Sequence, residues 1–305
     1  MKTLYLFSLV AFIVSCSGNK ASTDTSESTE DKQEAEMAES TIDAKTEANE
    51  MEAQASVLSD TDLKRYLGYY VGAFKADKYQ GEYLYSYYNK VNISIDSFGK
   101  STLFGHSVVA GNDRPFKGSY TFGNGAITAT CEEPGDDQYD GVFKFRIELS
   151  GKINGTWVAN NSKLTVYQRK YELSKKQFAY NPENDLDNSV SWIHLYNGED
   201  GDGPDGEFIT EDATKFNPST DSLKAEDIEN MYKGDLQIMR NSIYARHGYS
   251  FKTRKMRYIF DKYVDWYIPV STDVRDEITD LEWANIELLK RYEDHADEYY
   301  DSFGR

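Results

Sequence analysis

The sequence predicts an α+β protein with two folded domains, an antiparallel all-β barrel or sandwich and a small all-α domain after it. The first observation is a series of short runs between residues 63 and 175 that alternate apolar and polar side chains and are separated by Gly, Asn and Asp. Such runs are typical of antiparallel strands. The second is the spacing of apolar side chains at three to four residues within residues 218–298, which is typical of helices.

The first residues have the features of an export signal, which we assign to residues 1–15. Lys2 precedes an apolar run from Leu4 to Val14, and a serine and Cys16 follow it. The run is too short to cross a bilayer as a helix, but it has the size of the apolar region of a signal peptide. A small residue before a cysteine resembles the lipobox of bacterial lipoproteins. The resemblance implies cleavage before Cys16 and a palmitate-type acyl anchor on it; the alternative is an ordinary secretory signal with a coincidental cysteine.

Residues 16–62 are predicted to form a disordered acidic tether. From Ser17 to Asp62 there are 13 Asp and Glu residues, three Lys, and no Phe, Trp or Tyr. Such a segment buries too little apolar surface to offset the entropy of ordering, and its like charges extend it. The residue after Cys16 is Ser17, whereas an aspartate at that position would resemble a signal for retention in the inner membrane. We therefore expect the outer membrane of a Gram-negative bacterium, with the protein on its periplasmic or its outer surface.

Charge and cysteine content limit the class of protein further. The formal net charge is −18 at pH 7, and an acidic body argues against nucleic acid as a partner. The chain has two cysteines, so acylation of Cys16 would leave Cys131 without a disulfide partner. Cys131 ends a strand-like run, where a buried and inert thiol is expected rather than a nucleophile.

The β domain, residues 63–175, is expected to contain seven to nine strands. The predicted strands after a tyrosine-rich start are Val91–Ile95, Ser101–Ala110, Pro115–Phe122, Ala126–Cys131, Val142–Leu149, Ile153–Val158 and Leu164–Arg169. Short loops favour antiparallel pairing of neighbours, and closure into a barrel would leave no exposed edge.

Two short motifs of this region, Gly68–Phe74 and Gly151–Trp157, are loosely similar to barrels of the lipocalin kind. The resemblance implies a barrel that holds an apolar ligand, although small barrels are also filled by their own side chains. The tyrosine-rich start gives a second pattern: Tyr83, Tyr85 and Tyr87 would share one face of a strand. Exposed tyrosines can stack on sugar rings, but tyrosine is also simply a good strand former.

Residues 176–217 are expected to be an acidic, glycine-rich connector. In Asn197–Glu207, residues with carboxylate side chains alternate with glycines. Carboxylate oxygens are the ligands that a hard cation needs, but their spacing here is not that of an EF-hand loop. We therefore expect a solvated interdomain loop and no metal site. Ser191–Tyr196 has the pattern of one more strand.

The helical domain, residues 218–298, is expected to have helices at Leu223–Lys233, Leu236–Arg246 and Arg254–Tyr263 and a last helix that starts at a capping box, Thr279–Glu282. Gly248 suits the left-handed position that follows a helix end.

This domain also carries a recognisable pattern: Tyr244, Ala245, Arg246, His247 and Gly248. Further residues of the pattern follow in order, namely Tyr249, Phe251, Phe260, Trp266, Tyr267, Pro269, Leu281, Glu282, Asn285, Ile286, Leu288 and Leu289. Together they are similar to the YARHG domain, a small module named for those five letters, over about Pro218 to Glu293. The resemblance implies an exported bacterial protein and implies no catalytic activity or cofactor.

Basic residues gather around this motif. From Arg240 to Phe260 there is no Asp or Glu, and the candidates for binding an anion or a partner are Arg240, Arg246, His247, Lys252, Arg254, Lys255 and Arg257. Arginine suits carboxylates and phosphates, which envelope polymers carry. The other explanation is structural: Arg246 and His247 would bond backbone carbonyls or pair with acids of the last helix.

No catalytic motif is recognised. The four histidines are far apart, and zinc-ligand spacing, a serine-hydrolase elbow, a phosphate-binding loop and a dinucleotide turn are missing from the sequence. We therefore expect a non-enzymatic cell-envelope lipoprotein without a cofactor that binds an anionic envelope polymer or a protein partner. One alternative is a lipocalin-like carrier of an apolar ligand. The other is a cell-wall hydrolase that acts through His247 and a carboxylate.

Overall fold

The computed structural model describes residues 60–83, 87–190 and 209–299. These residues belong to one compact unit, residues 55–305. The predicted signal peptide, Cys16 and almost all of the tether lie outside the described residues, as do the strand predicted at Ser191–Tyr196 and the loop Asn197–Glu207. Within the described part of the chain, no helix is long and apolar enough to cross a membrane.

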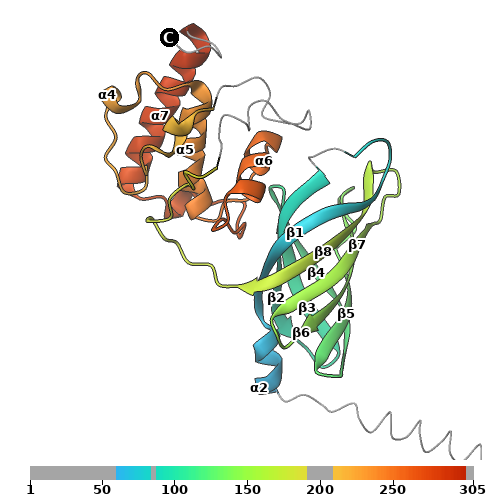
Figure 1. Cartoon of the computed structure of the whole chain (residues 1–305). Helices are drawn as coiled ribbons and strands as arrows, with labels where there is room; N and C mark the ends of the chain where they lie inside the picture. The colour runs from blue at the N-terminus through green and yellow to red at the C-terminus, as the bar shows by residue number, and fades with distance from the viewer. Residues whose placement is uncertain (1–59, 84–86, 191–208, 300–305) are drawn as a thin grey trace, which may run out of the picture. The chain divides into compact units, whose positions relative to one another are not determined.

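The first domain is a closed antiparallel barrel of eight strands, in which each strand pairs with its neighbours in sequence (Figure 1). The strands are β1 (Gly68–Tyr79), β2 (Tyr88–Phe98), β3 (Thr102–Val109), β4 (Asn112–Gly123), β5 (Ala126–Glu132), β6 (Gly141–Glu148), β7 (Lys152–Ala159) and β8 (Val166–Lys176). β1 pairs with β8 from Tyr69 opposite Lys176 to Tyr79 opposite Val166. This pairing closes the barrel and decides against the sandwich.

The strands follow from their alternating sequences. In β6, Phe143, Phe145 and Ile147 are buried while Lys144 and Arg146 are exposed, as expected for a strand with one face on a core. Tight turns join the strands. The clearest is Asn124–Gly125 between β4 and β5, where both residues have positive φ, the geometry that favours Asn-Gly in two-residue hairpins.

The interior of the barrel is filled with side chains over much of its length. Its largest fully buried members include Tyr66, Tyr70, Phe143, Ile93, Ile95, Leu103, Ile127, Ile147 and Ile153. Tyr66 comes from a short 3-10 turn, η1 (Lys64–Tyr66), after α2 (Asp60–Leu63), and its hydroxyl donates to the carbonyl of Gly125, 3.4 Å away. This segment therefore packs at the end of the barrel that carries the β4–β5 turn. Cys131 is fully buried, as expected, and burial raises its pKa to about 12, which disfavours the reactive thiolate.

The prediction of a strand face shared by Tyr83, Tyr85 and Tyr87 is wrong for the two tyrosines that the structure describes. β1 ends at Tyr79 and β2 begins at Tyr88, so Tyr83 and Tyr87 belong to the connection between them. Tyr85 lies outside the described residues. The rings of Tyr79, Tyr83 and Tyr87 lie 5.6 Å apart in each pair, and these mutual contacts replace the expected strand face.

The second domain is helical. Its elements are η3 (Glu211–Thr214), α4 (Ala225–Ile228), α5 (Lys233–Arg246), α6 (Arg254–Tyr263), η4 (Arg275–Glu277) and α7 (Asp280–Tyr299), and α5 and α7 pack side by side (Figure 1). The expected capping box at the start of α7 is present: Thr279 N donates to Glu282 Oε2 at 3.0 Å, and Glu282 N donates to Thr279 Oγ1 at 3.3 Å. The first helix is shorter than its predicted span.

Part of the expected connector belongs to the helical core. Leu186, Ile209 and Ala213 are buried in one cluster with residues of α5 and α6, and Thr210 donates from N and Oγ1 to Asp235 of α5. These connector residues therefore form part of a hydrophobic core, whereas Asn197–Glu207, the stretch expected to be a solvated loop, lies outside the described residues. The apolar positions are too widely spaced to form a helical or strand period, so composition alone suggested a loop.

Hydrogen bonds join α6 and the loop after it to β2. Lys90 Nζ donates to the carbonyls of Val264 and Tyr267 at 2.8 and 3.1 Å, and Lys90 N donates to Asp261 Oδ2 at 2.9 Å. Asn92 Nδ2 donates to the carbonyl of Pro269 at 3.0 Å. These bonds satisfy carbonyls at the end of α6 and hold the helix against the barrel strand.

Candidate functional site

The histidine of the motif lies in a buried hydrogen-bond network. His247 is 2 % exposed, and its Nε2 lies 2.8 Å from Oε2 of Glu282, which is fully buried on α7. Glu282 also accepts from Ser219 Oγ at 2.7 Å and from the Tyr180 hydroxyl at 3.1 Å. The Tyr180 ring stacks on the His247 imidazole with 4.2 Å between centroids. The network thus fastens three separate segments to α7.

The pKa of Glu282 reflects these contacts. Burial alone would raise it, but the hydrogen bonds from His247, Ser219 and Thr279 lower the pKa to about 2. Glu282 is therefore ionised at neutral pH and acts as the common acceptor of the network.

The arginine of the motif is also used inside the fold. Arg246 is 2 % exposed; its Nε donates to the carbonyl of Asn184 at 2.8 Å and its Nη1 donates to Ser242 Oγ at 2.7 Å. Its guanidinium lies 5.6 Å from the ring centroid of Trp266. Arg246 thereby holds the segment around residue 184 against α5.

Gly248 is required by backbone geometry. It has φ of +75° directly after α5 ends, the left-handed position where glycine is favoured. A Cβ added there would lie 2.4 Å from Cγ2 of Val270. Of the motif's five residues, Ala245 is buried as well, and only Tyr244 faces an open pocket.

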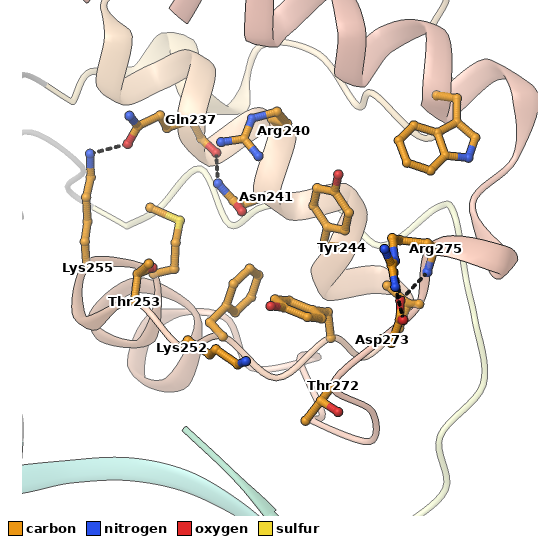
Figure 2. A pocket seen from close by; sticks show the side chains of 15 residues that line it. Gln237, Arg240, Asn241, Tyr244, Lys252, Thr253, Lys255, Thr272, Asp273 and Arg275 are labelled. Carbon is orange, nitrogen blue, oxygen red and sulfur yellow. Dashed lines mark hydrogen bonds and ion pairs between the residues drawn. The ribbon is translucent and has the colours of Figure 1, made fainter. Parts of the chain in front are cut away.

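That pocket, which we call the groove, has a volume of about 650 Å³ and is formed by α5, the loop after it, the start of α6, the loop at residues 272–275 and α7 (Figure 2). Its aromatic walls are Tyr244, Tyr249, Phe251 and Trp283. Tyr249 packs edge-on against Phe251 with ring centroids 5.3 Å apart. The groove therefore combines an aromatic wall with polar and charged side chains that can orient a ligand.

Four basic residues line the groove: Arg240, Lys252, Lys255 and Arg275. Two of them are paired with acids. Arg240 makes two bonds to Glu293, at 2.5 and 3.1 Å, and Arg275 makes two to Asp273, at 2.8 and 2.5 Å.

The two lysines of the groove differ from its arginines. Lys255 Nζ donates to the neutral amide oxygen of Gln237 at 2.5 Å (Figure 2). Lys252 is exposed, and among the described residues its ammonium has no hydrogen-bond or ion-pair partner. Positive charge is therefore presented beside an aromatic wall, the arrangement that an anionic ligand with apolar faces needs.

The candidates from the sequence thus fall into three places. Arg246 and His247 are buried and line neither this groove nor the pocket at the barrel mouth. Arg240, Lys252 and Lys255 line the groove, whereas Arg254 and Arg257 line the mouth of the barrel. Sequence reasoning missed Trp283 and the loop at residues 272–275 as parts of a site.

The family comparison agrees with this domain. Residues 214–294 match the YARHG domain family. This segment is a YARHG domain. No curated protein and no solved structure matches the chain at a significant level. The groove is therefore built entirely from residues of the YARHG domain, and the network around Glu282 joins that domain to Tyr180 before it.

Among the described residues, no group of three or more His, Cys, Asp or Glu side chains is placed to hold a metal ion. His247 does have a carboxylate within hydrogen-bond distance, as a hydrolase would need. Both groups, however, are buried and lie outside the two pockets.

Proposed function

We propose that this protein is a non-enzymatic binding protein of the cell envelope, held at the outer membrane through an acylated Cys16, and that the groove of its YARHG domain binds an anionic envelope polysaccharide. The YARHG domain itself suggests an extracytoplasmic binding or interaction module. The observation that carries the proposal is the groove, which Lys252 and Lys255 line together with Tyr244, Tyr249 and Trp283.

The groove suits such a polymer for two physical reasons. Flat aromatic side chains supply contact area at low cost in side-chain entropy and have polar edges. Lysine ammonium groups attract the carboxylates or phosphates of the polymer without fixing one geometry, which suits a repeating chain. The rest of the protein is acidic, so attraction comes from this local charge and not from the protein as a whole.

The hydrolase alternative gains nothing from the geometry of His247, because its carboxylate partner Glu282 is already shared among structural contacts. The carrier alternative is compatible with the barrel. Buried side chains fill much of the barrel interior that the structure describes, so no continuous apolar cavity runs through this part.

The test uses alginate as a carboxylated polysaccharide and dextran as its neutral counterpart. We expect the wild-type chain to bind alginate and not dextran at low salt. Changing Lys252→Glu together with Lys255→Glu should weaken alginate binding at least tenfold, about 1.4 kcal/mol or more. The melting temperature should change little, since substitutions at the protein surface usually have small effects on stability. Calorimetry and thermal unfolding measure both quantities.

The matched control is Lys224→Glu with Lys290→Glu, which changes charge equally at exposed positions outside the groove. Exposed ion pairs of this kind contribute little to stability. If the control weakens alginate binding as much as the groove variant does, general charge and not the groove accounts for binding, and the proposal fails.

A further inference from the structure

A second pocket lies at the end of the barrel opposite the segment that holds Tyr66. Its volume is about 570 Å³. Tyr87 before β2 lines it, together with residues of the loops that join β3 to β4, β5 to β6 and β7 to β8, and Arg254 and Arg257 of α6 complete its lining. Phe74, Phe143 and Trp157 form an apolar wall toward the barrel core. We call this pocket the mouth site; it shares no lining residue with the groove.

Arg169 of β8 is the central basic group of the mouth site. Its Nη1 donates to the carbonyls of Phe74 and Tyr87 at 3.1 and 2.7 Å, and its guanidinium lies 5.0 Å from the ring centroid of Phe74. Among the described residues no carboxylate pairs with it, and its Nε and Nη2 make no hydrogen bond. A guanidinium that is desolvated without an acid is costly, so its position calls for an explanation.

Two further guanidiniums lie at the same mouth. Arg257 of α6 donates to the carbonyl of Lys252. Burial first, and the positive charge of Arg257 as a smaller cause, lower the pKa of Arg169 to about 10. The pKa of Arg257 is itself lowered, first by burial and then, against the attraction of Asp261, by Arg254. The positive charges of Arg169 and Arg257 thus repel each other here, and an anion bound between these two side chains would relieve that repulsion.

A buried amide provides an independent observation. Asn89 of β2 lines the mouth site and is 6 % exposed, yet its Oδ1 is buried and has no hydrogen-bond partner among the described residues. An unsatisfied buried amide atom is costly. Because Oδ1 itself is closed to solvent, the Asn89 side chain would have to turn toward the pocket to bond a ligand there.

The acids of the mouth site are already engaged within the protein. Glu133 accepts from Gly141 N at 2.7 Å and from Trp157 Nε1 at 3.0 Å, and burial raises its pKa. Asp140 accepts two bonds from Arg114, at 2.9 and 2.8 Å. The third acid of the lining, Asp137, accepts from Tyr139 N at 2.8 Å. None of these three carboxylates pairs with Arg169.

We propose that the mouth site binds a small amphiphile with a carboxylate head group, the head lying among Arg169, Arg254 and Arg257 and the apolar body lying against Phe74 and Trp157. The apolar wall excludes a simple inorganic anion as the best ligand, and the arginines exclude a neutral hydrocarbon. Because the core below is filled, the body of the ligand is short. The site is separate from the groove and does not depend on polysaccharide binding.

The experiment measures octanoate and 1-octanol binding to the full chain by calorimetry. We expect octanoate to bind at least tenfold more tightly than 1-octanol. Arg169→Met keeps the apolar stem and should weaken octanoate binding at least tenfold. Lys170→Met is the matched control, because Lys170 is the next residue of β8 and its side chain is 62 % exposed; this variant should bind octanoate as the wild type does.

Arg257→Gln provides a second variant if loss of the Arg169 hydrogen bonds prevents folding, and it should also weaken octanoate binding. Absence of octanoate binding to the wild type, equal binding of 1-octanol, or unchanged affinity in the folded arginine variants would overturn the proposal. The groove variant Lys252→Glu with Lys255→Glu should retain octanoate binding, so failure at one site is distinguishable from failure at the other.

Discussion

The buried residues of the YARHG motif build the domain, and only Tyr244 of the motif faces the groove. Glu282 shows this most clearly, because one carboxylate accepts hydrogen bonds from Ser219, Tyr180 and Thr279 and pairs with His247. Removing one partner of a buried charged network leaves the others unsatisfied and is costly. The presence of Arg246 and His247 in the motif is thus explained by the chain segments that these two side chains hold together.

Glu282→Gln tests this role. The change keeps the size of the side chain but removes its charge, and we expect a loss of about 3 kcal/mol in the free energy of unfolding at pH 7. Urea unfolding measures the loss. Glu287→Gln, at an exposed position of the same helix, should change the free energy by less than about 0.5 kcal/mol.

The effect of Glu282→Gln on the free energy of unfolding should also depend on pH. The pKa of Glu282 is lowered to about 2 in the folded protein, below the ordinary value of about 4.3 for an unfolded chain. Its stabilisation is therefore present above about pH 4.3 and lost as pH falls toward 2. The stability difference between wild type and Glu282→Gln should shrink on acidification through this range. A difference that stays constant from pH 7 to pH 3 would contradict the role of the ionised carboxylate.

Elements with a strong local pattern were predictable from the sequence. The runs at Ala126–Cys131 and Val142–Leu149 correspond to β5 and β6, and the capping box correctly placed the start of α7. The choice between barrel and sandwich was not predictable, because it depends on pairing between β1 and β8, about a hundred residues apart in sequence. Local alternation carries no information about which distant strands pair.

The groove was predictable only in part. The gathering of basic residues after Arg240 drew attention to Lys252 and Lys255, which line the groove. It did not show that Arg240 is paired with Glu293, 53 residues away. Trp283 and the loop at residues 272–275 were missed because the groove combines separate elements, and no sequence spacing connects them.

At the scale of the whole molecule, the proposed anchor and the folded domains have separate tasks. Cys16 and the acidic residues after it would hold the folded domains near a membrane. The groove and the mouth site would then meet different ligands, a polymer and a small amphiphile. The negative charge of the chain as a whole, −18, works against nonspecific adsorption to anionic surfaces.

Labelled palmitate tests the anchor in growing bacteria. The wild-type protein should incorporate the label and sediment with membranes, because two or three acyl chains each contribute about 0.8 kcal/mol per buried methylene. Cys16→Ala should carry no label and appear in the soluble fraction. Membrane association that persists in Cys16→Ala without label would contradict the proposed anchor.

The central claim is that the groove of the YARHG domain, and not its buried motif residues or the barrel, is the surface that meets an anionic polysaccharide. Hydrogen exchange of the full chain with and without alginate tests it most directly. The account predicts slower exchange in backbone segments of the groove, residues 249–256 and 272–275, with no change in β3 to β7. Saturating alginate that protects the barrel strands, or protects neither groove segment, would contradict it.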